Sequence, residues 1–213
     1  MPFPGCRRVG VGKCTIFQRS CRLLDDLPER VDRSLVREVV LAELDGGRVL
    51  PAFVSAMVWG YGDRGYGATR VRWVLTGVKT GAHDAPVRGD VAGVLRTGTE
   101  VVRANGPLEG FRYMNNAGRI KHLGSAFFTK WLYFASALTS PDDPNAAPIL
   151  DDQVREWLEK HAGVILDISR TPDYQRYVET LTVWGENFGR TPVQVEKAIF
   201  GLATATPDLR NGD

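Results

Sequence analysis

The sequence predicts an all-α protein, folded as a compact multi-helix domain. Apolar residues recur at helical spacing in several stretches, cap residues and prolines precede the later stretches, and no stretch shows strong strand-like alternation. Of 213 residues, 43% are hydrophobic and 24% charged, so the chain can bury a core without disulfides. We assign residues 28–204 to the helical domain, 1–27 to an irregular basic segment and 205–213 to a C-terminal tail.

The first half of the helical domain begins at Pro28. The stretch PERVDRSLVREVVLAEL places Val31, Leu35 and Val39 on one face of a helix, and the Asp-Gly-Gly sequence at 45–47 ends that helix. Further helices are expected over residues 50–59, 68–77 and 91–105, separated by a glycine-rich loop at 60–67 and a turn-rich connection at 80–90.

The second half begins with a helix, a turn and a helix over residues 107–138, followed by a loop. The later helices have clear start signals. Asp151 can cap the next helix, and Thr171 is a cap residue followed by a proline. Thr191 and Gln194 form a capping box in front of the last helix.

Composition argues against several classes of protein. No apolar run is long enough to span a bilayer, and the first residues lack the apolar segment of a secretion signal, so we expect a cytoplasmic protein. The cysteines, at positions 6, 14 and 21, have no CxxC spacing, and the histidines, at 83, 122 and 161, are scattered. We therefore expect free thiols and no metal site.

Charge is unevenly distributed, although the net charge is only +2. Between Gly110 and Pro141 there is no acidic residue, and the first 24 residues also lack acids. The basic residues of the first of these stretches are Arg112, Arg119, Lys121 and Lys130. Such single-sign stretches predict a basic surface that faces a polyanion. The alternative is a solvated face whose acidic partners come from elsewhere in the fold.

Lys130 is the candidate nucleophile. It lies in LGSAFFTKWLYFASAL, residues 123–138, among aromatic residues and with no carboxylate nearby in the sequence. Burial among aromatic rings, or a place at a helix N-terminus, disfavours a protonated amine. A neutral lysine is a nucleophile that can form a Schiff base, and a carboxylate such as that of Asp151 can stabilise positive charge that develops during such a reaction. The alternatives are a lysine whose stem covers aromatic rings and an ordinary helix cap.

These residues resemble those of the helix-hairpin-helix DNA glycosylases. The stretch ILDDQVREWL is similar to the segment that holds the essential aspartate of that superfamily, and FTK resembles the GTK of its 8-oxoguanine branch, whose lysine is the nucleophile. Over residues 50–200, which include VWGYGDRGYGATRVRWVL and WGENFGRTPVQVEKAIFGL, the chain resembles bacterial 8-oxoguanine glycosylase-like proteins. One departure is the hairpin, where the usual LPGVG is replaced by HLGSAFF and only Gly124 is retained.

The resemblance implies a DNA repair glycosylase that excises 8-oxoguanine from duplex DNA, with Lys130 as Schiff-base nucleophile, Asp151 as assisting carboxylate and β-lyase activity. It also implies a place at the nucleoid and no iron–sulfur cofactor, because the cysteine cluster that loads iron–sulfur in other branches is absent. We expect a monomer, since nothing in the sequence suggests an obligate dimer, although the oligomeric state stays open. Such an enzyme extracts the damaged base from the stack and holds it between flat side chains. The candidates for this base pocket are Trp59, Phe134 and Trp184.

DNA contacts are expected from the hairpin and from the glycine-rich loop. The candidate residues are Arg119, Lys121, His122 and Gly124 in the hairpin, with Arg64 and Arg70 in or beside the loop. Two alternatives to this function stay open: a glycosylase for another modified base, and a helical DNA-binding protein without catalysis.

Overall fold

Helices supply all the regular secondary structure in residues 32–61 and 67–205, which are the residues described by this computed structural model. The all-α prediction is therefore confirmed for this part of the chain, and the segment 1–27 lies outside it. The eight helices of these residues are α2 (Arg33–Asp45), α3 (Val49–Tyr61), α4 (Gly67–Thr76), α5 (Val91–Asn115), α6 (Ser125–Ser136), α7 (Asp152–Ala162), α8 (Thr171–Glu186) and α9 (Pro192–Thr204).

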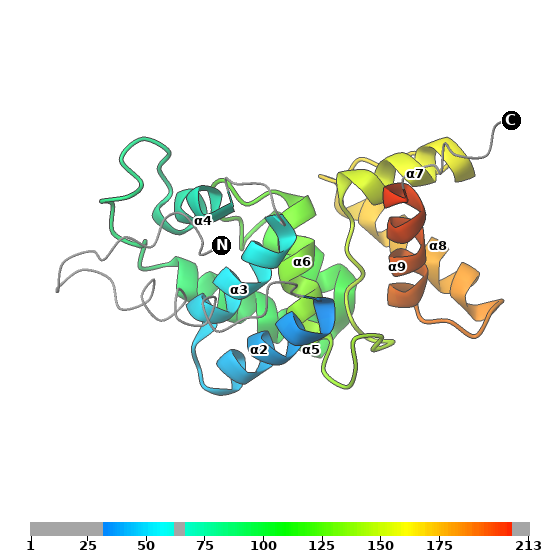
Figure 1. Ribbon diagram of the computed structural model, residues 1–213, viewed down its shortest axis with the longest axis horizontal. Helices are drawn as coiled ribbons and strands as arrows, with labels where there is room; N and C mark the ends of the chain where they lie inside the picture. The colour runs from blue at the N-terminus through cyan, green and yellow to red at the C-terminus, as the bar shows by residue number, and fades with distance from the viewer. Residues whose placement is uncertain (1–31, 62–66, 206–213) are drawn as a thin grey trace, which may run out of the picture.

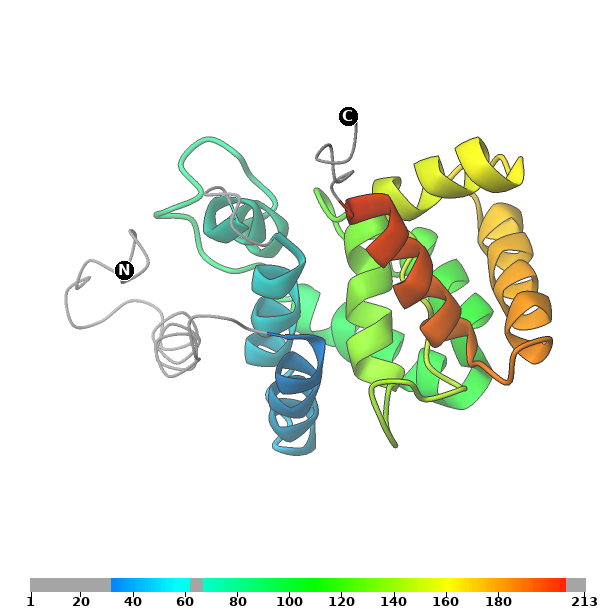
Figure 2. The ribbon, with the colours of Figure 1, turned by 45° about the vertical axis from the view of Figure 1, so that its right-hand side comes forward.

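The helices form two groups on either side of α6. Helices α2, α3 and α4 lie on one side, while α7, α8 and α9 lie on the other (Figure 1). α6 packs against α2, α3 and α5, whereas α9 packs against α7 and α8. α8 also packs against α5, so α5 connects the two groups; Figure 2 shows the second group from another side. The start of α7 lies close to α6, which brings sequence-distant residues together.

The core is continuous through α6. Its largest fully buried side chains include Trp131, Tyr133 and Phe134. Burial of side chains of this size stabilises a fold by about 1.5 to 3 kcal/mol each. The C-terminal carbonyls of α6 are also bound: Arg103 Nε donates to Ala135 O at 2.7 Å, and Arg37 Nε donates to Ala137 O. Basic side chains at a helix C-terminus are favourable because the last carbonyls have no partner within the helix. These contacts fix α6, and with it Lys130.

Local start and stop signals account for most helix boundaries. The capping box of α9 is present as predicted, with Thr191 Oγ1 accepting from Gln194 N at 3.2 Å. α5 bends at Gly106, where φ is 83°, a value that glycine adopts without strain. This bend corresponds to the predicted junction between a helix at 91–105 and the next one.

Three predicted boundaries are wrong by a few residues. α2 begins at Arg33 and not at Pro28, because Asp32 caps it by accepting a hydrogen bond from Leu35 N at 2.8 Å. α3 continues through Gly60 to Tyr61, so the helix does not break at its first loop glycine. α8 begins at Thr171, with Arg170 at the N-cap, so Thr171 is not the cap.

None of the helices in the described ranges has both the length and the apolar composition needed to cross a membrane.

Candidate active site

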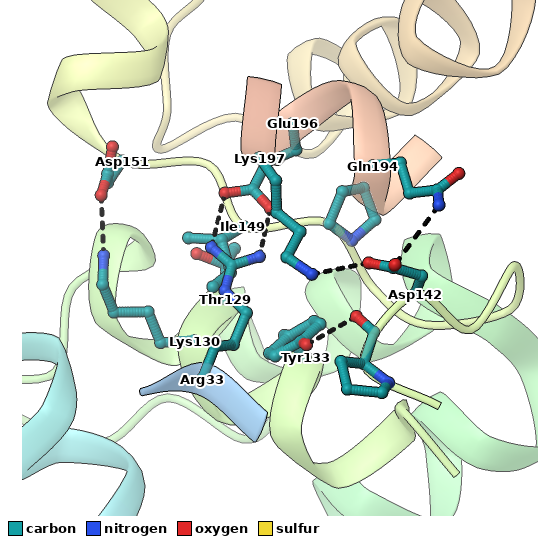
Figure 3. Close-up of polar contacts among 12 residues, drawn as sticks. Arg33, Thr129, Lys130, Tyr133, Asp142, Ile149, Asp151, Gln194, Glu196 and Lys197 are labelled. Carbon is teal, nitrogen blue, oxygen red and sulfur yellow. Dashed lines mark hydrogen bonds and ion pairs between the residues drawn. The ribbon is translucent and has the colours of Figure 1, made fainter. Parts of the chain in front are cut away.

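Lys130 and Asp151 meet in the structure. Lys130 Nζ donates to Asp151 Oδ2 at 2.9 Å (Figure 3). It also donates to Ala126 O at 3.2 Å. Both side chains are largely buried, with 8% of the lysine and 15% of the aspartate exposed. Lys130 has no acidic residue close to it in the sequence. Its amine is paired with the Asp151 carboxylate, 21 residues further along the chain. Neither side chain is completely enclosed by the described residues.

The position of Lys130 within α6 differs from the expectation. α6 begins at Ser125, so Lys130 is its sixth residue and lies beyond the first turn. The effect of the helix dipole is confined to the terminal turn. The dipole of α6 therefore gives no reason to expect a neutral amine at Lys130. The ion pair with Asp151 is the dominant feature of its environment.

Asp151 uses its two carboxylate oxygens differently. It is the N-cap of α7, where Oδ1 accepts a hydrogen bond from Val154 N at 3.2 Å, and Oδ2 accepts from Lys130. The neighbouring candidate, Asp152, is exposed and pairs at 3.6 Å with Arg155 on the surface of α7. The structure therefore selects Asp151 as the carboxylate at the lysine.

One aromatic ring at the amine is Phe127, which the sequence argument did not choose for the base pocket. Lys130 Nζ lies 5.5 Å from the centroid of the Phe127 ring, and this ring stacks on Tyr61 at 4.2 Å. Arg70, on α4, lies over the other ring of this pair, 5.8 Å from the Tyr61 centroid. Phe127 precedes Lys130 by three positions, so the helical spacing contained the signal for their contact.

The three predicted pocket rings have different environments. Phe134 is completely buried, and its ring packs edge-on against Trp59 at 5.1 Å. Trp59 is half-buried, and Arg33 lies 5.3 Å from its centroid. Trp184 is half-buried in the last turn of α8. That end of α8 lies away from the start of α7 in both ribbon views (Figures 1 and 2). Of the three, Trp59 combines partial exposure with a place beside α6.

Gly60 gives the lysine stem its room. A Cβ atom at this position would lie 2.7 Å from Lys130 Cδ and 3.5 Å from Phe127 Cε1. The glycine on α3 therefore allows the two helices to approach closely at the level of the amine. The sequence had suggested only that the Gly-Tyr-Gly units pass close to something.

The candidate DNA-contacting residues of the hairpin lie on one exposed turn between α5 and α6. Arg119, Lys121, His122 and Gly124 are all exposed there, and Gly124 is the N-cap of α6. His122 has a φ of 69°, a left-handed conformation that is uncommon for residues other than glycine. Such backbone conformations are concentrated at functional sites.

The structure describes only one of the two candidate DNA-contacting residues at the glycine-rich loop. Arg70 is exposed on α4, whereas Arg64 lies outside the described residues.

An additional buried ion pair joins α2 to α9. Arg33 donates two hydrogen bonds to Glu196, at 2.6 and 2.9 Å, and Glu196 is completely buried (Figure 3). Burial acts to lower the pKa of Arg33, but the charge and hydrogen bonds of Glu196 outweigh this effect and raise it. Arg33 also lies over the Tyr133 ring, 4.8 Å from its centroid. Sequence reasoning missed this pair because its members are 163 positions apart.

Within residues 32–61 and 67–205, no group of three or more histidine, cysteine or acidic side chains is arranged to hold a metal ion. The groups that the structure brings together at Lys130 are an amine, a carboxylate and an aromatic ring.

Comparison with known proteins gives one family. The model of the family described as "Putative 8-oxoguanine DNA glycosylase OGG-like protein" matches residues 13–200. No curated protein and no solved structure matches the chain.

Proposed function

Since the chain belongs to the 8-oxoguanine DNA glycosylase OGG-like family, we propose that it excises 8-oxoguanine from duplex DNA with Lys130 as nucleophile and Asp151 as assisting carboxylate. The observation that carries this proposal is the 2.9 Å contact between Lys130 Nζ and Asp151 Oδ2, at a place where both side chains retain some exposure. Two residues from separate helices have been brought together, one of which can attack C1′ and the other of which can handle protons and positive charge.

The reaction begins with the ion pair. An amine must give up a proton before it attacks, and the carboxylate bonded to Lys130 Nζ is placed to accept that proton. The lysine nitrogen forms a bond to C1′ as the bond from C1′ to the base nitrogen breaks, and the electron pair leaves with the base, which takes up a proton. Asp151 passes the proton it accepted to the departing base, and the carboxylate charge restored in this way stabilises the positive charge that develops on the sugar.

The lyase step follows from the same covalent intermediate. Opening of the sugar ring converts the lysine adduct into a Schiff base. Loss of a proton from C2′ then breaks the bond between C3′ and its oxygen, which cleaves the strand on the 3′ side and leaves the phosphate on the released end. Water finally hydrolyses the Schiff base and restores the lysine.

The extruded base would lie against Phe127 and Trp59. Phe127 is half-buried and contacts the amine, and Trp59 is half-buried beside α6. Phe134 has no exposed surface, so its contribution to the pocket is to support the Trp59 ring from behind. Trp184 stays a prediction, and its turn of α8 lies away from the start of α7.

The exposed turn between α5 and α6 would bind the DNA backbone. Arg119 and Lys121 supply positive charge, and the first backbone N–H groups of α6 can donate to a phosphate, since a helix leaves these groups without a carbonyl partner of its own. Arg70 is exposed on α4 and supplies a further positive charge. The predicted partner is thus a DNA duplex with one damaged base, bound by a single copy of the chain.

Borohydride trapping on a duplex containing 8-oxoguanine tests the assignment. Wild-type protein is expected to form a covalent adduct, Lys130→Gln to form none, and Asp151→Asn to form it far more slowly. Lys197→Gln is the matched control, because Lys197 is also ion-paired, to Asp142 at 2.6 Å, but lies on α9. An adduct that survives Lys130→Gln would show that another amine is the nucleophile.

The same assay separates the two alternatives. A panel of duplexes with other modified bases would reveal a different lesion preference, since adduct would then form with one of them and not with 8-oxoguanine. A DNA-binding protein without catalysis would bind duplex with strong salt dependence, form no adduct with any lesion and bind equally well after Asp151→Asn.

A further inference from the structure

The segment that leads into Asp151 is held by two tyrosines of α8. Tyr177 Oη donates to Ile149 O at 2.7 Å, and Tyr174 Oη donates to Pro148 O at 2.9 Å. Residues 148–150 are buried and have neither helix nor strand hydrogen bonds, so their carbonyls depend on side chains for partners. The two tyrosines are three positions apart on one helix, and this spacing brings both hydroxyls to the same side.

Both phenols are buried donors. Tyr174 and Tyr177 are completely enclosed, and burial raises the pKa of each above the ordinary value for tyrosine, which favours the protonated form that donates these hydrogen bonds. The ring of Tyr174 also stacks on Phe111 of α5 at 4.2 Å, which fixes α8 relative to the helix that precedes the hairpin.

A weaker contact connects the same segment to the lysine. Thr129, the residue before Lys130, has its hydroxyl 3.4 Å from both the N–H and the carbonyl of Leu150. The residue before the nucleophile thus contacts the residue before the carboxylate. Together, the contacts from α8 and α6 determine where Asp151 begins α7, and therefore the direction of its Oδ2 atom.

We propose that Tyr177 and Tyr174 are positioning residues that hold Asp151 at Lys130. This inference rests on the proposed function, because it assumes that the pair performs the chemistry. Neither tyrosine need touch the substrate. Each acts by donating to the carbonyl of a residue that precedes Asp151 by two or three positions, Ile149 or Pro148. Loss of the Tyr177 hydroxyl would leave the Ile149 carbonyl buried without a partner, and the segment would shift to satisfy it.

The test compares three substitutions that each remove one buried hydroxyl. Tyr177→Phe and Tyr174→Phe remove the positioning contacts. Tyr133→Phe is the control, because its hydroxyl also donates to a proline carbonyl, Pro141 O at 2.8 Å, but in a part of the loop distant in sequence from Asp151. Single-turnover excision, adduct yield with borohydride, affinity for undamaged duplex and urea denaturation are measured for each protein.

We expect the excision rate of Tyr177→Phe to fall on the order of tenfold or more, because small displacements of reacting groups are costly. Tyr174→Phe, whose carbonyl partner is one residue further from Asp151, should show a smaller fall. DNA affinity should not change in either variant, and Tyr133→Phe should keep its rate within about twofold. The difference in excision rate between Tyr177→Phe and the wild type should also become smaller as the pH rises. At higher pH, solvent can take the proton of the Lys130 amine that Asp151 would otherwise accept.

Each outcome separates this inference from the proposed function. Active wild-type protein with an undiminished rate in folded Tyr177→Phe would overturn the positioning role and leave the proposed function intact. Equal falls in Tyr177→Phe and Tyr133→Phe, with unchanged pH profiles, would also overturn it, because loss of stability alone would explain them. No adduct in the wild type would instead refute the proposed function. If Tyr177→Phe does not fold, the comparison of Tyr174→Phe with the control decides the question.

Discussion

Exchange of Gly60 for alanine tests whether the position of the lysine amine matters for activity. The added Cβ would lie 2.7 Å from Lys130 Cδ and 3.4 Å from Lys130 Cε. Carbon atoms in contact are usually about 3.5 to 4.0 Å apart, so either the lysine stem or α3 must move by about 1 Å. The amine is bound to Asp151 and to Ala126 O, and the stem is buried, so a displaced stem moves the amine away from the carboxylate.

The expected effects on stability and on activity are very different. Overpacking of a buried site costs about 1 to 3 kcal/mol, and replacement of glycine by alanine in a helix returns up to about 1 kcal/mol. Gly60→Ala should therefore remain folded, with a modest loss in the free energy of unfolding. A displacement of about 1 Å between reacting groups can lower a rate by about 100-fold, so the excision step should suffer far more.

Gly93→Ala provides the control for Gly60→Ala. Gly93 is also helical, in the first turn of α5, and a Cβ there meets open space. Single-turnover excision of 8-oxoguanine and urea denaturation are measured for both variants. Gly93→Ala should keep the wild-type rate and gain slightly in stability. A folded Gly60→Ala protein that excises the base at the wild-type rate would contradict the argument, because it would mean that α3 moves and the amine does not.

Three further predictions concern charge. Glu196→Gln leaves the buried guanidinium of Arg33 without its counter-charge, so the free energy of unfolding should fall by about 3 to 5 kcal/mol in urea denaturation. Lys197→Gln removes the hydrogen bond and charge that lower the pKa of Asp142. The stability from that pair is present above the ordinary carboxyl pKa and lost as the pH falls through the lowered one, so the variant should lack this loss in unfolding experiments over a pH series. Arg119→Gln should weaken binding to all duplex sequences similarly and reduce the salt dependence of log Kd by about one phosphate contact, as measured by fluorescence anisotropy.

The helices could largely be predicted from the sequence, because the residues that start and end a helix lie close together in the chain. The capping box at Thr191 and the N-cap at Asp151 are each complete within four residues, and both are present in the structure. The boundary at Thr171 was missed by one residue because a threonine followed by a proline is compatible with the cap and with the first helical position. The glycine at 106 was expected near a helix junction, and it is the point where α5 bends.

The site residues could be predicted less well from the sequence than the helices, because the burial of a side chain depends on the whole fold. Phe134 and Phe127 flank Lys130 at helical spacing, four residues after it and three before it, so spacing alone does not distinguish them. The structure does: α6 crosses the core, and Phe134 is completely enclosed while Phe127 keeps exposed surface. The hydroxyl of Tyr177 presents a similar difficulty, because its partner carbonyl is 28 residues away in a segment without regular structure.

The two explanations of Asp151, as a helix cap and as a functional carboxylate, are compatible. Its Oδ1 atom accepts from Val154 N at 3.2 Å and its Oδ2 atom accepts from Lys130 at 2.9 Å, so each oxygen has one of the two tasks. The cap bond fixes the side-chain rotamer relative to α7, and the backbone that precedes Asp151 is held by Tyr174 and Tyr177, so that Oδ2 is directed at the amine. An asparagine at this position could still cap α7 through its carbonyl oxygen, but it would present an uncharged group to the lysine. Asp151→Asn therefore removes the charge while keeping the helix start, whereas Asp151→Ala removes both. A comparison of the two variants separates the catalytic contribution of this residue from its structural one.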